Sequence, residues 1–140
     1  MLKLISKKHN KLNKLEKKKI IDLKNTHWSY TFAEQNQYLK DNYKKNDFHN
    51  LFFFQDKLIG YTAFRNQYLI YKNKKYKYLH FDCLVILKKY RNRKLSKLLM
   101  NFNEYTIIKN SLPSILFCEK KLIKFYKKFD WKINYGKKMI

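Results

Sequence analysis

Apolar and polar residues follow two different spacings along this chain, and each spacing predicts a different kind of element. Near the N-terminus, apolar side chains recur among lysines at roughly helical spacing, namely Leu12, Leu15, Ile20 and Leu23. This pattern predicts an amphipathic surface helix that covers a sheet. A second short helix is expected over residues 32–43, because Thr31 and Glu34 stand at the spacing of a capping box.

The spacing changes from His49 onward. Aromatic and β-branched runs broken by polar turns are typical of antiparallel strands, and here they cover residues 51–54, 58–71 and 76–87. Polar turns are expected between them at residues 55–57 and 73–75. The middle of the chain is therefore predicted to be a meander of three strands.

Helical spacing returns in the last third of the chain. Apolar side chains recur at steps of three and four residues, namely Leu95, Leu98, Leu99, Phe102, Tyr105 and Ile108. This stripe predicts a helix packed on the sheet, and Pro113 ends it. A short buried strand is expected at residues 114–118, a last helix at 122–129, and one or two terminal strands at 131–140.

The order of these elements defines the fold class. A strand, a helix and a second strand in succession form a crossover, which forces parallel pairing of its two strands. We therefore expect an α/β (α+β) fold, with a mixed, mostly antiparallel sheet and helices on both faces. A length of 140 residues fits one domain spanning residues 1–140.

The charge of the chain is strongly positive. Lys and Arg number 33 against 10 Asp and Glu, which gives a formal net charge of +23. Such an excess favours partners that carry phosphates. The only arginines, however, are Arg65, Arg91 and Arg93, and arginine is the residue that phosphate and base recognition favour. A lysine excess spread through every segment is more typical of a solvated surface, so nucleic-acid binding is the alternative hypothesis.

The cysteines and the hydropathy pattern indicate the cellular compartment in which the protein is expected. Cys83 and Cys118 lie inside apolar runs without CxxC spacing or a histidine at ligand spacing, so we expect buried free thiols, no metal and no disulfide. No apolar stretch approaches the ~20 residues needed to span a bilayer, and residues 1–19 contain no continuous hydrophobic run of a signal peptide. A cytoplasmic location fits these features.

Residues 86–99 carry the clearest chemical signal, because a strand turns there directly into a helix. A helix start presents unpaired N–H groups and the positive end of the helix dipole, which can hold a pyrophosphate. The cations that could assist are Arg91, Arg93, Lys94 and Lys97. Anion binding and a bare basic helix start both fit this pattern.

The same residues resemble a known family. The strand end with Ile86, Tyr90 and Arg91 resembles a V-x-x-x-Y-R run, and residues 91–96 overlay the phosphate motif [Q/R]-x-x-G-x-[G/A]. Residues 122–131 are similar to an A-x-x-x-Y-x-x-x-G-F segment. These are motifs of the GCN5-related N-acetyltransferase (GNAT) family. Residues 58–61, with a glycine after two apolar residues, also resemble a strand of that family, so the resemblance covers about residues 51–131.

The chain departs from the family motifs at four positions. Lys94 and Ser96 stand at the two glycines of the phosphate motif, Asp130 stands at the glycine before the closing aromatic, and Glu119 stands at a common asparagine. Glycine is normally needed where the backbone approaches a phosphate closely. The Lys94 side chain must therefore either point away from the ligand or crowd it.

The resemblance implies an N-acetyltransferase that uses acetyl coenzyme A (acetyl-CoA). It implies a slot for the pantetheine arm where the strand at residues 84–86 splays from residues 115–118. Backbone groups of Leu84 and Ile86 would pair with the pantetheine amides. The complete coenzyme-binding set that it implies is Leu84, Val85, Ile86, Arg91, Asn92, Arg93, Lys94, Leu95, Ser96 and Lys97.

The resemblance also gives Tyr126 the role of the acid that protonates the departing thiolate, whereas from the residues alone a packed aromatic is favoured. His80 and Asp82 alternate on one strand and so face one side, with Leu84 and Ile86 continuing that side. Either polar residue could be the general base or a substrate ligand, or could simply be hydrogen-bonded. The acceptor-binding residues expected near the N-terminus are His27, Trp28, Gln35 and His49.

The acceptor is expected to be a small amine, such as an amino sugar, or a protein amino group. The net charge of +23 repels polycations and favours a neutral or anionic acceptor, such as a phosphate-bearing sugar. The protein is expected to be a monomer or homodimer. The rival hypothesis is a non-catalytic basic module of the same fold that contacts nucleic acid or an acidic partner.

Overall fold

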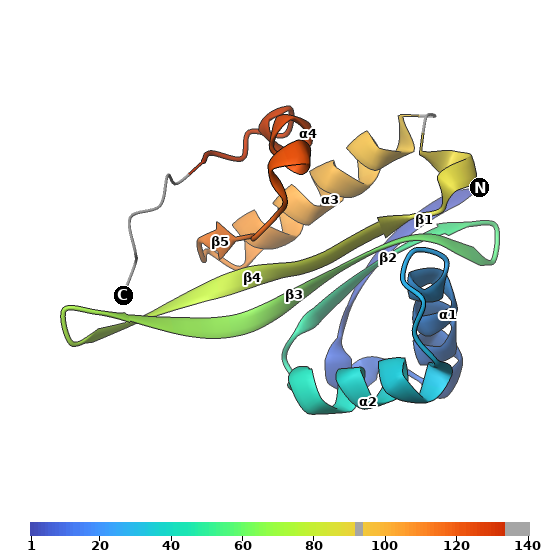
Figure 1. The fold of residues 1–140 in the computed structure, drawn as a ribbon, viewed down its shortest axis with the longest axis horizontal. Coiled ribbons are helices and arrows are strands. Elements are labelled where there is room, and N and C mark those ends of the chain that lie inside the picture. The colour runs from blue at the N-terminus through green and yellow to red at the C-terminus, as the bar shows by residue number, and fades with distance from the viewer. Residues whose placement is uncertain (92–93, 134–140) are drawn as a thin grey trace.

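The fold is described by a computed structural model, which covers residues 1–91 and 94–133. Over those residues, five strands form one sheet in the order β1-β2-β3-β4-β5 (Figure 1). The strands are β1 (Leu2–Lys8), β2 (Phe48–Phe54), β3 (Lys57–Tyr71), β4 (Lys74–Ile86) and β5 (Ser114–Ile115). The first four pair in antiparallel fashion and β5 runs parallel to β4, as the crossover predicted.

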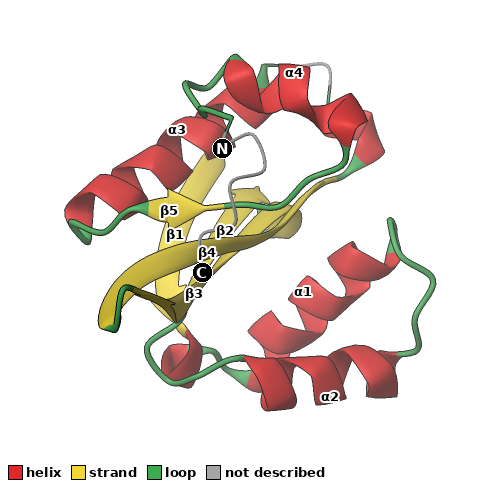
Figure 2. Cartoon of the chain, turned by 60° about the vertical axis from the view of Figure 1, so that its left-hand side comes forward, coloured by secondary structure: helices red, strands yellow, loops and turns green. Residues whose placement is uncertain are grey.

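Helices cover both faces of the sheet (Figure 2). One face carries α1 (Lys14–Asn25) and α2 (Phe32–Asn42), and the other carries α3 (Leu95–Lys109) and the short α4 (Ile123–Lys127). Single 3-10 turns lie at His9–Lys11, Lys88–Tyr90 and Lys120–Leu122. The predicted mixed sheet with helices on both faces is confirmed.

Capping boxes fix the starts of both N-terminal helices. Thr31 accepts a hydrogen bond from the Glu34 N–H, and the Glu34 carboxylate accepts one from the Thr31 N–H, as the sequence predicted. Asn13 and Glu16 form the same reciprocal pair at the start of α1. Each box satisfies backbone donors that a helix start leaves unpaired, and so defines where the helix begins.

The chain opens with a strand, so the expected order, which began with a helix, was wrong at this point. β1 pairs with β2 along its whole length, from Leu2 opposite Phe54 to Lys8 opposite Phe48. Leu4 and Ile5 of this strand are partly buried, whereas Lys3, Ser6 and Lys8 are exposed, as is common for a strand at the edge of a sheet. In α1, Ile20 and Leu23 are buried as predicted, but Leu15 is exposed.

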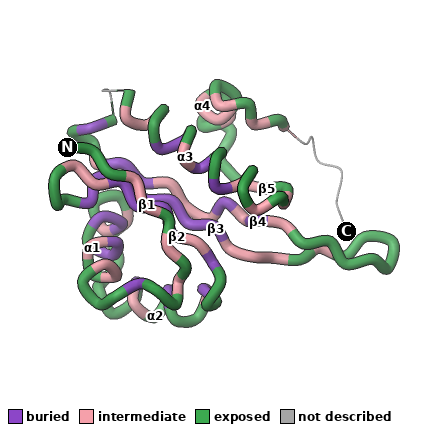
Figure 3. The backbone as a smooth tube through the Cα atoms, turned by 180° about the vertical axis from the view of Figure 1, so that it is seen from behind, coloured by how far each residue is buried: buried purple, intermediate pink, exposed green. Residues whose placement is uncertain are grey.

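The buried residues concentrate in the central strands (Figure 3). On the side of α1 and α2, Ile20 and Ile21 pack in one cluster with Tyr61 and Val85. On the other side, Leu99 of α3 packs in a cluster with Phe52 and other strand residues. The sheet is therefore covered by an apolar layer on each face, which stabilises it through burial.

The buried face of α3 differs from the predicted apolar stripe. Leu98, Tyr105 and Ile108 are exposed. Asn103 and Thr106 of α3 turn inward instead and form hydrogen bonds with the sheet. The Asn50 side-chain amide donates to both of them, at 3.0 Å each. Asn103 in turn donates to the Thr62 hydroxyl, at 3.0 Å. These hydrogen bonds allow polar side chains to occupy the interface between α3 and the sheet, although the buried Asn50 Oδ1 has no partner there among the described residues.

The C-terminal part is less regular than predicted. The strand expected at residues 114–118 covers only Ser114–Ile115, and Phe117 and Cys118 are exposed. Residues 131–133 form no strand, and the rest of the expected terminal strands, residues 134–140, lies outside the described residues. The expectation that Cys118 is a buried thiol was therefore wrong.

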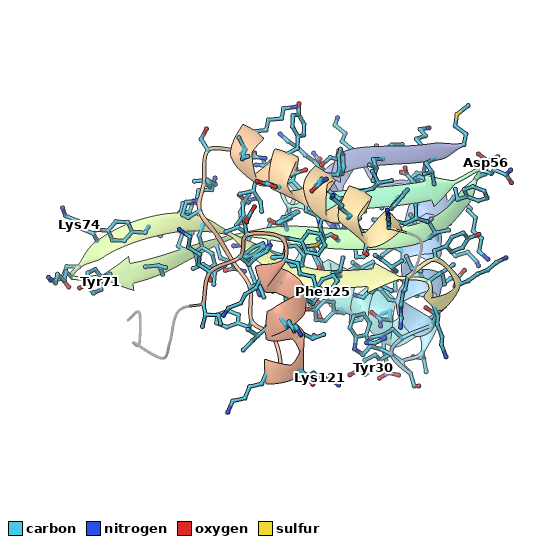
Figure 4. The ribbon with its side chains drawn as sticks, turned by 90° about the horizontal axis from the view of Figure 1, so that it is seen from above. Tyr30, Asp56, Tyr71, Lys74, Lys121 and Phe125 are labelled. Carbon is cyan, nitrogen blue, oxygen red and sulfur yellow. The ribbon has the colours of Figure 1, made fainter. Side chains whose placement is uncertain are left out.

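The β3–β4 hairpin extends beyond the rest of the sheet. Tyr71 and Lys74 mark its tip at one end of the molecule, and Asp56 marks the β2–β3 turn toward the other end (Figure 4). Tyr68, Tyr71 and Tyr76 of this hairpin are exposed. Within the described residues, no helix is long and apolar enough to cross a membrane.

Candidate active site

A bulge in β4 sets the geometry of the site. Ala63 of β3 pairs with Cys83, but the next residue, Phe64, pairs with Phe81, so Asp82 has no partner on β3. An extra residue of this kind shifts the alternation of side chains beyond it. Asp82 and Cys83 consequently both face the side of α1 and α2, where they line one pocket.

The bulge corrects one expectation from the sequence. Leu84 and Ile86 were predicted to continue the side of His80 and Asp82. Both instead pack in the apolar clusters on the opposite face, together with residues of α3. Val85 lies on the side of α1 and α2, in the cluster that Cys83 also contacts. The side chain of Asp82 and those of Leu84 and Ile86 therefore point to opposite faces of the sheet.

The two parallel strands separate close to this bulge. β4 and β5 pair only at Leu79 with Ser114 and at His80 with Ile115. β5 then ends, whereas β4 continues to Ile86. The edge of β4 from Asp82 onward is thus not paired with β5 in the described part of the chain. This is the splayed edge that the resemblance implied for the pantetheine arm.

The start of α3 has the features of an anion site. Its N-cap residue, Lys94, adopts φ 59° and ψ 11° in the left-handed region, and its side chain makes no capping hydrogen bond. The side chain is exposed, so it does not fill the helix start from within. Lys94 forms no side-chain cap, and a helix start of this kind leaves backbone N–H groups available to an anion.

Of the other residues predicted to bind the coenzyme, Arg91, Leu95, Ser96 and Lys97 lie at or next to this helix start. Arg91 is tethered by a hydrogen bond from its Nε to the Ile86 carbonyl, at 2.9 Å. Leu95 and Ser96 are partly buried and Lys97 is exposed. Asn92 and Arg93 lie outside the described residues.

A pocket of about 430 Å³ opens on the face that carries α1 and α2. It is lined by Lys24, Trp28, Tyr30, Glu34, Gln35, Tyr38, Asp82 and Cys83. Trp28, Gln35 and Asp82 were among the residues predicted from the sequence. Lys24, Glu34 and Tyr38 were not, because only the packing of α1 against α2 brings them together.

The remaining predicted residues take other positions. His27 lies edge-on to Trp28, with ring centroids 4.6 Å apart, and does not line the pocket. His49 is fully buried behind the pocket wall, so the expectation that it contacts the acceptor does not hold. His80 is partly buried and lies edge-on to Phe117. Burial lowers the pKa of His80, although the Asp82 carboxylate acts in the opposite direction.

The Asp82 carboxylate is held by several polar contacts in the wall of the pocket. Its side chain is only 10% exposed. One carboxylate oxygen accepts hydrogen bonds from Tyr43 and, at 3.5 Å, from Tyr38. The other lies 3.9 Å from Nη1 of Arg65. Because these donors hold the carboxylate in place beside the pocket, it can accept a proton from a bound amine.

Tyr126 lies on α4, on the opposite face from the pocket. Its ring is edge-on to Phe81 and to Trp131, at centroid distances of 5.9 and 6.3 Å. Burial raises the pKa of Tyr126 to about 12, and the neighbouring Cys118 and Cys83 thiols add to the shift. Tyr126 is thus protonated at neutral pH, and it lies near the β4 bulge.

The fold and this site define a class of protein, and comparison with known families identifies it. The Acetyltransferase (GNAT) family matches residues 17–131. The chain belongs to this family, which is one of N-acetyltransferases. The resemblance seen in the sequence is thereby confirmed.

Solved structures support the same fold. Escherichia coli ElaA superposes with a TM-score of 0.74 at 18% identity, covering 92% of this chain and 86% of that chain. Glucosamine-6-phosphate N-acetyltransferase from Arabidopsis thaliana gives a TM-score of 0.69 at 17% identity, covering 96% of this chain and 95% of that chain. Aminoglycoside N-acetyltransferase AAC(6')-Iy, in complex with CoA, gives 0.70 at 11% identity, covering 99% and 95%. No curated protein sequence matches the chain.

Proposed function

We propose that this protein transfers the acetyl group of acetyl-CoA to a small-molecule amine held in the pocket beside Asp82. The observation that carries the proposal is the β4 bulge. It places a held carboxylate in a pocket at the point where β4 and β5 separate. An acceptor amine and a thioester lying along the edge of β4 would then meet beside this strand.

The coenzyme side of the proposal depends on two features. The uncapped start of α3 offers backbone donors for a pyrophosphate, with Arg91 and Lys94 beside it. The unpaired edge of β4 offers backbone groups of Leu84 and Ile86 to the pantetheine amides. When bound, acetyl-CoA supplies an activated acetyl thioester. A similarly folded acetyltransferase has been solved with CoA.

Asp82 is proposed as the general base. An amine can attack only in its neutral form, so a proton must leave it. The Asp82 carboxylate is held by Tyr38, Tyr43 and Arg65 and lines the pocket, so it can take that proton without moving. His80, on the same face of β4, is proposed as a second ligand of the acceptor.

Tyr126 is proposed as the acid that donates a proton to the departing thiolate. Burial raises the pKa of Tyr126 to about 12, so the phenol keeps its proton at neutral pH and has one to donate. The thiolate that leaves acetyl-CoA needs a proton, which a positioned hydroxyl can supply.

The net charge of the chain, rather than the pocket lining, favours a neutral or anionic acceptor, because the lining holds Glu34 and Asp82 beside one lysine. Lys24 lines the pocket, and its ammonium group lies 4.9 Å from the centre of the Tyr38 ring. Together with the net charge of +23, it repels a polycationic amine. An amino sugar that carries a phosphate fits this balance better than an aminoglycoside, and a glucosamine-6-phosphate N-acetyltransferase is among the similar folds.

We further propose a cytoplasmic monomer or homodimer, consistent with the free thiols Cys83 and Cys118.

Two measurements test the function. Coenzyme A should raise the melting temperature, because a ligand that binds only the folded state stabilises it by mass action. A panel of neutral, anionic and polycationic amines with acetyl-CoA, followed by thiol release, should show turnover with the first two groups.

Changing Arg91 and Arg93 together to Ala should weaken coenzyme binding by about tenfold or more, since charge-assisted phosphate bonds contribute roughly 1.5 to 3 kcal/mol. Unchanged affinity in calorimetry would refute the placement of the coenzyme.

A further inference from the structure

A chain of hydrogen-bonded side chains runs through the core behind the pocket. His9 Nδ1 lies 2.9 Å from His49 Nε2, and His49 Nδ1 lies 2.6 Å from the Tyr61 hydroxyl. The Tyr61 and Tyr43 hydroxyls hydrogen-bond to each other, and Tyr43 donates to Asp82. The chain thus links partly buried His9, outside the pocket, to the carboxylate inside it.

The middle of this chain is withdrawn from water. His49 and Tyr61 are fully buried, and Tyr43 is 6% exposed. The rings also stack, with centroid distances of 5.6 Å between His9 and Tyr43 and 5.7 Å between His49 and Tyr61. An apolar core would not need these polar groups, whereas each member here has a hydrogen-bonding partner on either side.

Every interior member of the chain can both donate and accept a proton. Burial lowers the pKa of His49 to about 3, and the positive charges of His9, Lys24 and Lys17 act in the same direction. His49 is therefore neutral at pH 7, with one nitrogen that donates and one that accepts. Burial raises the pKa of Tyr43 and of Tyr61 far above 10, so both phenols keep their protons.

We propose that these side chains form a proton relay, which carries the proton that Asp82 takes from the acceptor amine to solvent at His9. The proposal rests on the proposed acetyl transfer. The relay gives the proton a path to solvent that starts on the side of Asp82 away from the acceptor. The proton can then leave while acceptor and coenzyme still fill the pocket.

The step balances without any other reactant. Before it, protonated Asp82 donates to Tyr43, Tyr43 to Tyr61, Tyr61 to His49 Nδ1, and His49 Nε2–H to His9 Nδ1. Each proton then crosses its own hydrogen bond, so that one O–H or N–H bond breaks and one forms at every interior member. Asp82 ends ionised, His9 releases one proton from Nε2 to water, and both histidines exchange tautomers. Asp82 changes its charge in this step, and no charge is created on Tyr43, Tyr61 or His49.

The other charged groups near the chain leave this path open. Lys17 lowers the pKa of His9 and Asp47 raises it, while burial is the larger cause of its lowered value. The Asp47 carboxylate is already engaged by the Lys44 N–H and by the backbone and side chain of Asn66. Arg65 faces Asp82 from β3, with Nη1 at 3.9 Å from the carboxylate oxygen that Tyr43 does not contact. These contacts lie beside the chain of hydrogen bonds and do not use its donors or acceptors.

Proton exchange tests the relay without any substrate. In a His9→Phe protein, a ring still stacks on Tyr43 and closes the outer end. The imidazole N–H of His49, observed by NMR with ¹⁵N-labelled histidine, should then exchange with water through Tyr61 and Asp82. Adding Tyr61→Phe, which deletes only the hydroxyl, should slow this exchange by about 10²-fold, the scale of a positioned proton-transfer group. Equal exchange in the two proteins would overturn the relay.

Thr106→Val is the matched control, because it removes a buried hydroxyl on the opposite face of the sheet. Added to His9→Phe, it should leave the His49 exchange unchanged. If it slows the exchange as much as Tyr61→Phe does, the effect is not specific to the chain and the relay is refuted.

Turnover provides a second test, which does not depend on the folding of the double variants. Tyr61→Phe alone should lower kcat for acetyl transfer by about tenfold or more while leaving the KM for acetyl-CoA unchanged. A normal kcat would count against the relay. Because the exchange measurement needs no amine, exchange through Tyr61 in a protein that acetylates nothing would refute the proposed function alone. Acetylation without this exchange path would refute the relay alone.

Discussion

Replacing Lys94 by glycine should make the protein more stable and bind coenzyme A less well. Lys94 precedes α3 with φ 59°, and Asp130 precedes Trp131 with φ 65°. Both stand where the family motifs carry glycine. The left-handed conformation costs an ordinary residue roughly 1–2 kcal/mol, whereas glycine adopts it without a steric penalty.

The magnitude follows from two opposing terms. Glycine relieves the steric cost but loses about 0.5–1 kcal/mol more backbone entropy on folding. The net gain is about 0.5–1 kcal/mol, which corresponds to a rise of about 2–4 °C in Tm for a domain of this size. The lost ammonium group removes about 1 kcal/mol of attraction to a phosphate, or about fivefold in Kd.

Three variants separate the backbone from the charge. Lys94→Gly should be stabilised and should bind coenzyme A more weakly, with a flatter salt dependence. Lys94→Ala should bind equally weakly without the gain in Tm, because alanine keeps the strained conformation. Asp130→Gly should gain stability with unchanged affinity. Calorimetry of unfolding and binding checks all three.

Two results would contradict this reasoning. If Lys94→Gly and Asp130→Gly melt no higher than the parent protein, the left-handed backbone carries no penalty here. If Lys94→Gly binds coenzyme A more tightly, the lysine side chain crowds the ligand rather than holding it.

Three further predictions concern side chains of the site and the core. Tyr126→Phe should lower turnover by about 10²-fold with little change in Tm; normal turnover would leave Tyr126 a packed aromatic. In the native protein, an aromatic disulfide reagent at pH 8 should modify exposed Cys118 and spare Cys83, whose pKa is raised to about 12, and Cys118→Ser should abolish the fast reaction. Because the folded pKa of His49 is about 3 against an ordinary 6.5, the unfolded state binds more protons between these values. The free energy of unfolding should therefore fall as the pH drops below 6.5, by up to about 1.4 kcal/mol per pH unit from this group, and His49→Gln should flatten that dependence in acid denaturation curves.

The sequence predicted the elements whose signals are local. The capping box at Thr31, the strand meander and the turn from β4 into α3 each depend on residues close together in the chain, and the structure contains all of them. No element was predicted over residues 2–8, because apolar and polar residues do not alternate regularly there. β1 forms because it pairs with β2, which lies about forty residues away in the chain.

Features that depend on tertiary partners could not be predicted. Asn103 and Thr106 looked like the solvent side of α3, and they are buried only because Asn50 and Thr62 offer matching hydrogen bonds. Tyr43 and Tyr61 are two of twelve tyrosines, and nothing local distinguishes them. The pocket residue Asp82 was found from the sequence, but its side of the sheet relative to Leu84 was not, because a bulge leaves no mark in composition.

The bulge in β4 adds one residue without disturbing the rest of the sheet. If Asp82 were removed, Phe81 and Cys83 would be consecutive and would keep their β3 partners Phe64 and Ala63, so the alternation of side chains would be regular. Leu84 and Ile86 would keep their place in the apolar clusters under α3. The extra residue therefore brings a carboxylate to the pocket while both faces of the sheet keep their packing. An insertion of this kind is a way in which a strand gains a functional residue without a change in its core.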